Sequence, residues 1–466
     1  MTQPNILWIC TDQQRWDTIR CLGNKHINTP NIDRLASEGV AFTHAFAQCP
    51  VCTPSRASFL TGMYPSSIHA CMNGNDYWAD AAPLVPKLLS DNGYDCGLSG
   101  KLHLAGAQGR VEPRGEDGYS TYHWSHDSID RWETGHEYAD WLKEKGHDLS
   151  VFNSAPETMP PDLHQTTWCA DKAIAFMKGE RNGPWLFSVN PFDPHPPFDP
   201  PGEYLQRYSP DILPDPLWRD SDISAHKPFA GSDGFFENPR SPEELDGKSI
   251  KAAYYAMIEL VDHNVGRMLD ALEDTGQREN TIVIFTSDHG ELLGDHGFHT
   301  TKGCAFFEGS VRVPLIMSWP GHFHESRTSD ALVQLIDIAP TLLEYAGVQC
   351  PIRMQGSSLN GILQSNSISH RDYVFSEYFR DQTLSPHLRP NFEGSYATMI
   401  RNRRYKLIAY HNRNTGRLYD LEQDPHEFDN LWSNPKLADI RAELMQISFN
   451  RLALAVDVGP KPKTGF

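Results

Sequence analysis

The stretch Thr281-Ile-Val-Ile-Phe-Thr-Ser287 decides the fold, together with the polar residues Asp288-His289-Gly290-Glu291 that follow it directly. A continuous run of apolar and β-branched residues predicts a strand buried on both faces, which is typical of a parallel sheet covered by helices. In open α/β sheets, ligand sites lie at the edge formed by the carboxyl ends of the strands. The stretch therefore predicts both a class of fold and one part of a functional site.

The same pattern, a strand followed by polar side chains, occurs three more times. Strands are predicted at residues 5–10, 94–99 and 185–189, and helical segments such as 250–274 alternate with the strands. This alternation indicates an α/β fold with a large, mostly parallel sheet flanked by helices. We expect one group of polar residues to meet where these strands end: Asp12, Gln13, Lys101, His103, His195, Asp288 and His289.

The pattern changes after about residue 350. A helix is predicted within residues 435–455, and short antiparallel strands are predicted at 373–377, 395–400, 405–410 and 417–421. We therefore expect a catalytic α/β domain over residues 1–350 and a smaller C-terminal α+β domain, with an antiparallel sheet, over residues 351–466.

Two long segments, 105–165 and 199–247, are rich in Gly, Pro, Asp and aromatic residues and show no clear periodicity. Segments of this kind form surface loops and the walls of pockets. We expect them to contribute to specificity.

The composition excludes several classes of function. The formal charge of −19, from 60 acidic against 41 basic residues, argues against nucleic-acid binding, so any anion site must be made locally by a few basic residues. No apolar run has the length of a membrane span, which argues against a membrane protein. The N-terminus lacks the basic segment and cleavage site of a signal peptide, so we expect a cytoplasmic protein.

A further stretch, Cys49-Pro-Val-Cys52-Thr-Pro54-Ser-Arg56-Ala-Ser-Phe-Leu-Thr61-Gly62, predicts a loop that enters a short helix. Pro54 suits the first helical turn, and Gly62 suits the end of the helix. Cys52 then lies at the N-terminus, where the helix dipole favours a negative or polarised group. Arg56 lies four residues further on the same face.

This cysteine has two other interpretations. Cysteine is often simply a buried structural residue. Cys49 and Cys52 also form a Cys-x-x-Cys pair that could act as a redox dithiol, whereas a zinc site would need a second pair of cysteines, which the chain lacks. The nine cysteines are scattered and odd in number, which favours free thiols over a disulfide framework.

The segment from Cys52-Thr-Pro54-Ser-Arg56 to Leu60-Thr61-Gly62 resembles the Cys-x-Pro-x-Arg signature of the sulfatase family, in the alkaline phosphatase superfamily. The resemblance implies that Cys52 is oxidised after synthesis to formylglycine (3-oxoalanine), whose hydrate attacks the sulfate ester. It also implies a formylglycine-generating maturation enzyme as a partner. The resemblance covers most of residues 4–345, with a weaker similarity over residues 415–427.

Two carboxylates, an amide oxygen and an imidazole suit a divalent cation that prefers oxygen ligands. The resemblance implies calcium, with ligands from Asp12, Gln13, Asp288, His289 and the modified Cys52. Many members have Asp and Asn where this chain has Gln13 and His289, and imidazole is a less usual ligand for calcium, so Mg²⁺ and Mn²⁺ are alternatives. The other interpretation is that Asp12 and Asp288 cap loops or helices.

A sulfate ester is an anion, so its cleavage requires positive charge around its oxygens. Lys101 and Lys302 can supply such charge; each could instead be a solvated surface lysine. Gly100-Lys101-Leu-His103 resembles the second signature of the family, which ends in Gly-Lys-x-x-His or a close variant. In this chain only one residue separates the lysine from the histidine.

The mechanism that the resemblance implies assigns a role to each remaining residue. The hydrate at position 52, activated by the metal and Asp288 and held by Arg56, attacks sulfur. His195 or Lys302 protonates the leaving alcohol as the general acid. His103 then removes a proton so that sulfate is released. His195 lies among prolines and could instead be an ordinary loop residue.

These features predict a sulfuric ester hydrolase that acts on an aryl, sugar or small alkyl sulfate. The alternative is a phosphonate monoester or phosphodiester hydrolase of the same superfamily. Such relatives share the Asp-Gln and Asp-His pairs and the formylglycine, but tend to lack the Lys-x-His element that this chain has in Lys101 and His103. A third hypothesis is a binding protein that keeps Cys52 unmodified.

Overall fold

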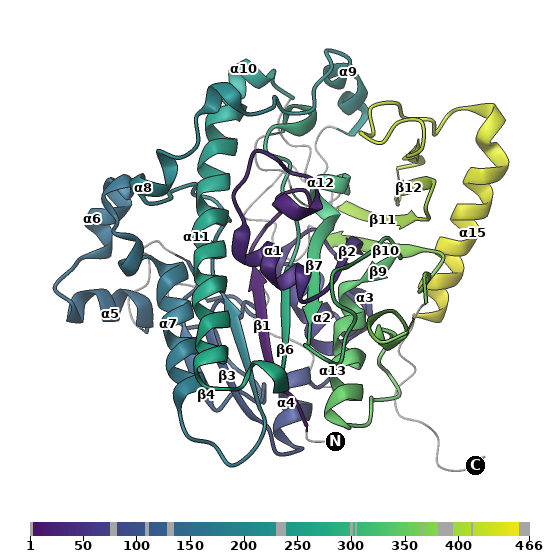
Figure 1. Cartoon of the computed structure of the whole chain (residues 1–466). Helices are drawn as coiled ribbons and strands as arrows, with labels where there is room; N and C mark the ends of the chain where they lie inside the picture. Colours follow the sequence, from purple (N-terminus) through teal and green to yellow (C-terminus); the bar gives the residue numbers. More distant parts are fainter. Residues whose placement is uncertain are drawn as a thin grey trace, which may run out of the picture.

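The computed structural model describes residues 3–74, 82–107, 111–127, 135–229, 239–298, 302, 305–365, 367–380, 395–411 and 413–455. Within these ranges, the centre of the protein is a nine-stranded sheet in the order β4-β3-β5-β1-β6-β7-β2-β8, with β9 paired to β2 (Figure 1). Its strands are β1 Asn5–Thr11, β2 Gly39–Phe46, β3 Asp95–Gly100, β4 Thr121–Trp124, β5 Trp185–Asn190, β6 Thr281–Ser287, β7 Arg312–Ser318, β8 Arg327–Ser329 and β9 Val333–Gln334.

Most strand pairs in this sheet are parallel. Neighbours from β4 to β6 all pair in parallel, as β2 does with β8 and β9, whereas β7 is antiparallel to both β6 and β2. Strands β1, β5 and β6 are buried along their whole length, which explains their continuous apolar sequences. The predicted large, mostly parallel sheet is confirmed.

Helices cover both faces of the sheet. Alternate residues of β1 point to opposite faces and pack into a separate hydrophobic core on each face. On one face, Leu7 and Ile9 pack with residues of α1, α7 and α11. On the other face, Ile6 and Trp8 pack with residues of α2, α4 and α13. These helices are α1 Pro30–Ser37, α7 Gln165–Lys178, α11 Gly247–Asp274, α2 Cys52–Thr61, α4 Val85–Ser90 and α13 Ile338–Ala346.

A second, smaller sheet is antiparallel throughout, in the order β10-β11-β12-β13, and it confirms the predicted C-terminal α+β region. Helix α15 packs against β11 and β12 (Figure 1). Buried ion pairs join Glu308 of α12 to Arg401 and Lys406 of this sheet. The domain boundary at residue 350 stays a prediction. The elements are β10 Val374–Arg380, β11 Ser395–Arg401, β12 Tyr405–Tyr410, β13 Thr415–Asp420, α15 Ala438–Leu454 and α12 Glu308–Val311.

The two segments expected to be loops contain more regular structure than their sequences indicate. The described part of residues 105–165 contributes β4, an edge strand of the main sheet, the α-helices α5 and α6, and two short 3-10 helices. β4 is only four residues long and mostly half-buried, so it lacks a periodic apolar pattern. The remaining short helices are α3 Pro65–Ile68, α5 Glu137–Glu144, α6 Leu149–Ser154, α8 Gly202–Leu205, α9 Asp222–His226, α10 Pro242–Leu245 and α14 Asn360–Leu363.

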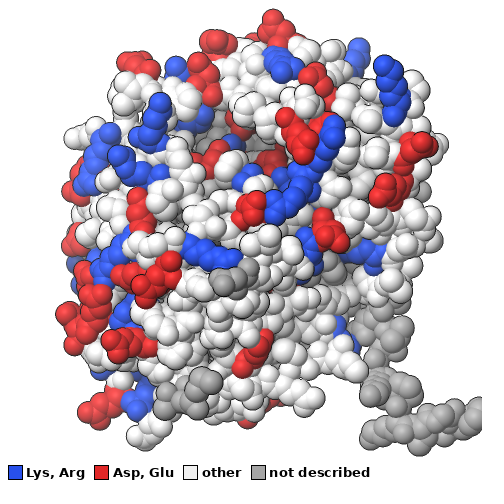
Figure 2. Space-filling view, turned by 45° about the vertical axis from the view of Figure 1, so that its right-hand side comes forward, with Lys and Arg blue, Asp and Glu red and all other residues white. Residues whose placement is uncertain are grey.

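The charge is distributed without a continuous basic area on the face shown in Figure 2, where acidic and basic side chains of the described residues are interspersed. Among the helices within the described ranges, none is long and apolar enough to cross a membrane.

Candidate active site

The carboxyl ends of the central strands place four of the expected residues next to one another. Thr11 of β1 pairs with Ser287 of β6, so the residues that follow the two strands leave the sheet at the same level. Those residues are Asp12, Gln13, Asp288 and His289, and each is 0% exposed. The site is therefore buried at this edge of the sheet.

Helix α2 brings Cys52 to this edge from another part of the chain. The helix begins at Cys52 after the extended Val51 and ends at Gly62, whose φ of 68° is left-handed. All ten of its residues are buried, so it is a core element whose N-terminus faces the strand ends. The predicted short helix, with Cys52 in its first turn, is confirmed.

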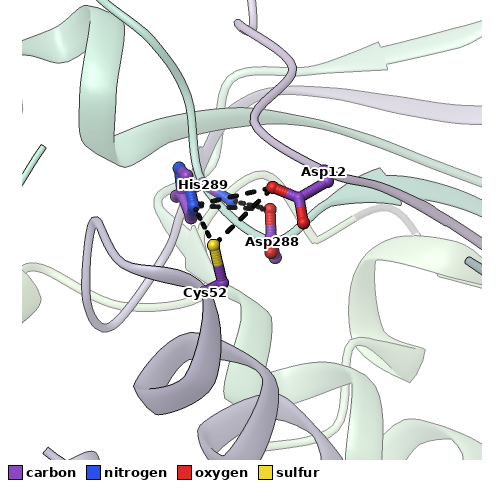
Figure 3. Close-up of side chains that lie close together, drawn as sticks. All are labelled: Asp12, Cys52, Asp288 and His289. Atoms are coloured by element: carbon purple, nitrogen blue, oxygen red, sulfur yellow. Dashed lines mark hydrogen bonds and ion pairs between the residues drawn. The ribbon is translucent and has the colours of Figure 1, made fainter. Parts of the chain in front are cut away.

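Figure 3 shows Asp12, Cys52, Asp288 and His289 pointing toward one another, and one ligand atom from each lies within 4.8 Å of the others. Cys52 Sγ lies 3.1 Å from His289 Nε2 and 3.7 Å from Asp12 Oδ1. His289 Nδ1 lies 2.9 Å from the carbonyl oxygen of Gly290, which cannot donate, so the ring nitrogen donates to it. Nε2 of a neutral His289 ring then keeps its lone pair for the centre of the cluster.

Gln13 completes the set of oxygen donors. Its backbone is left-handed, with φ of 69°, and its N–H donates to Asp288 Oδ1 at 3.0 Å. Its side-chain Nε2 donates to the carboxylate of Glu291. Its Oε1 is buried and has no hydrogen-bond partner among the described residues. Two carboxylates, a buried amide oxygen without a partner and an imidazole nitrogen fit a divalent cation.

Two buried cations balance the aspartates. Arg56 is 1% exposed, and it donates from Nε to Asp288 Oδ2 at 2.9 Å and from Nη2 to Asp12 Oδ2 at 3.3 Å. Its Nη1 donates to the carbonyl oxygen of Lys101 at 2.9 Å, and Lys101 Nζ lies 2.6 Å from Asp12 Oδ2. Lys101 is itself 1% exposed, so the alternative of a solvated surface charge does not apply to it.

These charges set the protonation of the cluster. Burial by itself raises the pKa of the Asp12 carboxyl, but Lys101 and Arg56 hold that pKa well below its usual range. Burial and Asp12 likewise raise the pKa of the Cys52 thiol, but Lys101, together with Lys302, outweighs them and lowers it. The site therefore stabilises negative charge at position 52.

Cys49 has a different environment. Its side chain is 0% exposed, and burial raises the pKa of its thiol well above the usual range. Both Cys49 and Cys52 are free thiols. A redox dithiol needs a reactive thiolate, which this environment provides at Cys52 alone of the pair.

His195 and Lys302 form a pair beside Cys52. Lys302 Nζ lies 2.8 Å from His195 Nε2 and 3.7 Å from Cys52 Sγ. His195 Nδ1 lies 2.6 Å from the carbonyl oxygen of Pro196, so Nδ1 carries the proton and Nε2 accepts from the lysine. His195 is thus held in contact with the site.

His103 follows the end of strand β3. Its backbone is left-handed, with φ of 56°, and its N–H donates to Glu112 Oε2 at 2.8 Å. Its ring meets His126 edge-on, with centroids 4.6 Å apart. Burial and Lys101 hold the pKa of His103 well below its usual range, so the ring is neutral.

Three residues that the sequence analysis did not single out support the site. Glu291 accepts from Gln13, Glu112 accepts from His103, and Tyr254 donates its hydroxyl to the Gln13 carbonyl oxygen at 2.6 Å. Only Glu291 had a sequence signal, since it follows Asp288-His289-Gly290 directly. Glu112 and Tyr254 come from segments whose approach depends on the tertiary fold.

A second buried cluster, Asp222, His226 and His296, also has metal-ligating side chains within 4.8 Å of one another. Arg417 Nη2 donates to His226 Nδ1 at 2.8 Å, which places the proton of a neutral His226 ring on Nε2. That nitrogen faces Asp222 Oδ1 at 3.8 Å. The protonated nitrogen and the adjacent guanidinium make this cluster unsuited to a cation.

Comparison with known proteins gives the family. Residues 4–348 match the family model described as Sulfatase, and residues 294–452 match the model described as N-sulphoglucosamine sulphohydrolase, C-terminal. An arylsulfatase of Clostridium perfringens (strain 13 / Type A) is 32% identical over 453 residues, which cover 92% of this chain and 90% of the relative. An N-acetylglucosamine-6-O-sulfatase of Bacteroides thetaiotaomicron is 27% identical and covers 96% of this chain and 85% of its own.

Among solved structures, a phosphonate monoester hydrolase of Agrobacterium radiobacter matches with a TM-score of 0.79 and 27% identity, over 98% of this chain and 97% of the other. The same fold thus carries more than one kind of ester hydrolysis. The sulfatase family model nevertheless covers most of this chain, and the two curated relatives named above are both sulfatases. The chain therefore belongs to the sulfatase family and is a sulfuric ester hydrolase.

Proposed function

We propose that the protein cleaves the monoester of an aryl, sugar or small alkyl sulfate by means of a formylglycine at position 52 and a divalent cation. One observation carries this proposal. Cys52 stands in the Cys-x-Pro-x-Arg register at the first turn of α2, with its Sγ 3.1 Å from His289 Nε2 and 3.7 Å from Asp12 Oδ1. The thiol marks the place of the nucleophile, next to the residues that would hold the cation.

Asp12, Gln13, Asp288 and His289 would hold the cation, with the modified residue 52 beside it. Their mostly oxygen donors suit Ca²⁺ first, with Mg²⁺ or Mn²⁺ as alternatives. When bound, such a cation polarises sulfuryl oxygens and stabilises charge that develops on them.

The hydrate of formylglycine supplies an oxygen nucleophile that, unlike a serine hydroxyl, can regenerate a carbonyl and so release sulfate. A formylglycine-generating enzyme is the partner that this modification requires. Arg56, which contacts both aspartates, positions the nucleophile. Lys101 places a second buried charge on the same side of the site.

The leaving alcohol needs a proton, and the pair His195 and Lys302 is placed to give one. Lys302 Nζ lies 3.7 Å from Cys52 Sγ and 2.8 Å from His195 Nε2, so a lysine proton can reach the leaving oxygen either directly or through His195 Nε2. His103, neutral and held by Glu112, acts as the base for the release of sulfate.

A phosphonate monoester or phosphodiester hydrolase is the alternative, because the solved phosphonate monoester hydrolase matches nearly the whole chain. The discriminating residues are Lys101 and His103. We expect them to favour a sulfuryl group, because an ammonium binds its oxygens and a histidine base assists elimination.

The test compares an aryl sulfate, an aryl phosphonate monoester and an aryl phosphodiester on the protein co-expressed with a maturation enzyme. We expect the highest kcat/KM for the sulfate, its loss in Cys52→Ala, and its retention in the control Cys49→Ala. His103→Ala should accumulate a covalently sulfated enzyme after a burst. A higher kcat/KM for the phosphonate would favour the alternative, and full activity in Cys52→Ala would end the proposal.

A further inference from the structure

Glu291 is a buried acid that the proposed mechanism does not use. It is 0% exposed and lies three residues after Asp288, where the chain turns away from β6. Its Oε2 accepts from Gln13 Nε2, and its Oε1 accepts from the backbone N–H of Leu292 at 2.6 Å. Both carboxylate oxygens are therefore engaged by N–H donors.

The backbone of Gln13 is fixed independently of Glu291. Its N–H donates to Asp288 Oδ1 at 3.0 Å, and its carbonyl oxygen accepts from Tyr254 Oη at 2.6 Å. These two contacts hold the residue in its left-handed conformation, with φ of 69°. They leave open which end of the side-chain amide faces the cluster.

That choice matters because the two ends of an amide are alike in shape and opposite in polarity. The oxygen accepts and can ligate a cation, whereas the NH₂ group only donates and would repel one. A carboxylate at position 291 can only accept, so it draws the NH₂ group to itself. Gln13 Oε1 is then the buried acceptor without a partner among the residues that the structure describes.

We propose that Glu291 is a positioning residue that selects the amide orientation of Gln13, so that the oxygen and not the NH₂ group is presented to the cation. This inference rests on the cation site of the proposed function. It makes Gln13 and Glu291 a matched pair in which one position supplies an amide and the other a carboxylate.

The pairing leads to an exchange experiment. In Glu291→Gln, the amide introduced at position 291 would keep its oxygen on the Leu292 N–H and turn its NH₂ group toward Gln13. That NH₂ group would draw the Gln13 oxygen away from the cation, so the selection is reversed. The double variant Gln13→Glu with Glu291→Gln exchanges the two groups at equal size and equal total charge. The amide introduced at position 291 would keep its oxygen on the Leu292 N–H and donate to the new carboxylate at position 13, which again presents an oxygen to the cation.

The measurement is Ca²⁺ affinity of the metal-stripped full chain, by calorimetric titration. We expect Glu291→Gln to weaken Ca²⁺ binding about 10- to 100-fold, the usual effect of removing a group that orients a metal ligand. The double variant should return to within a few-fold of wild type or bind more tightly. Saturating Ca²⁺ should restore kcat in Glu291→Gln, which a general loss of structure would not allow.

The control is Glu377→Gln, an equally buried glutamate that accepts from Ser66 N–H and Arg451 away from the cluster. We expect its Ca²⁺ affinity to equal that of wild type. If Glu291→Gln does not fold, the double variant decides: recovery of fold and Ca²⁺ affinity supports the inference, and folding without Ca²⁺ binding overturns it.

Two results separate this inference from the proposed function. Wild-type affinity in Glu291→Gln, with binding abolished in Asp288→Ala, would overturn the role of Glu291 and leave the cation site standing. No binding of Ca²⁺, Mg²⁺ or Mn²⁺ by wild type would overturn the cation site and this inference together.

Discussion

Arg56→Met would remove the guanidinium that lies between the two aspartates of the site while keeping an unbranched apolar side chain in helix α2. Arg56 is 1% exposed, and it is bonded to Asp288 at 2.9 Å, to Asp12 at 3.3 Å and to the Lys101 carbonyl at 2.9 Å. Asp12 keeps Lys101 at 2.6 Å, so the carboxylate left without its cation is chiefly Asp288. In the metal-free protein this is an uncompensated buried charge.

The expected loss of stability in Arg56→Met follows from that geometry. Breaking a buried ion pair from one side costs about 3–5 kcal/mol. Unfolding entropy of about 2.1 cal/mol/K per residue gives about 1 kcal/mol/K for 466 residues, so the Tm of the metal-free protein should fall by about 3–5 °C. A cation held by the same carboxylates would neutralise their charge. A ligand at about 1,000 times its Kd raises the free energy of unfolding by about 4 kcal/mol. The difference in Tm between variant and wild type should therefore shrink as Ca²⁺ is added.

Scanning calorimetry in chelator and in saturating Ca²⁺ measures this difference. Arg403→Met is the control, because its ion pair with Asp330 is exposed (57% and 63%) and its loss should cost at most about 1 kcal/mol, with or without Ca²⁺. Sulfate ester turnover in Arg56→Met should fall by about 10²–10³ or more. The reasoning is refuted if the Tm difference between Arg56→Met and wild type is the same at both Ca²⁺ levels, because Arg56 and the cation would then not share carboxylates.

Three further predictions concern the other residues of the site. Asp12→Ala and Asp288→Ala should each abolish metal binding and turnover in a folded protein, and unchanged metal content by elemental analysis would contradict the ligand assignment. Lys101→Ala should lower kcat/KM for sulfate esters about 10²- to 10³-fold, as loss of an electrostatic donor does, with a smaller effect on any phosphodiesterase activity; an equal loss of both activities in steady-state assays would argue against its selectivity. Peptide mass spectrometry after co-expression with a maturation enzyme should find an aldehyde at position 52 and a thiol at Cys49, and the reverse pattern would exclude the assignment of the nucleophile.

Much of the fold could be predicted from the sequence because its determinants are local. Strand β6 at Thr281–Ser287 has the bounds that its apolar run predicts, since a strand buried on both faces needs apolar residues throughout. Gly62 ends α2 in the left-handed conformation, which glycine adopts without the steric strain that other residues have there. The sequence also indicated that polar residues gather at one edge, because parallel strands that carry them at their carboxyl ends share that edge.

Other features needed the tertiary structure. The end of helix α1 at Ser37 depends on distant contacts, because the residues from Gly39 form β2, which pairs with β7. β4 was not predicted, because a short edge strand has no buried periodic face. The antiparallel direction of β7 was also hidden, since an apolar run does not encode the orientation of its partners.

By itself, the sequence determined the class of fold, the helix that carries Cys52 and the acidic pairs that follow two strands. The tertiary structure alone decided how the side chains meet. Lys302 reaches His195 across 107 positions of sequence, and Glu291 accepts a hydrogen bond from Gln13 across 278. Such contacts follow from long-range packing of segments, whereas a strand or a helix cap follows from neighbouring residues, and for that reason only the second kind can be predicted from local sequence.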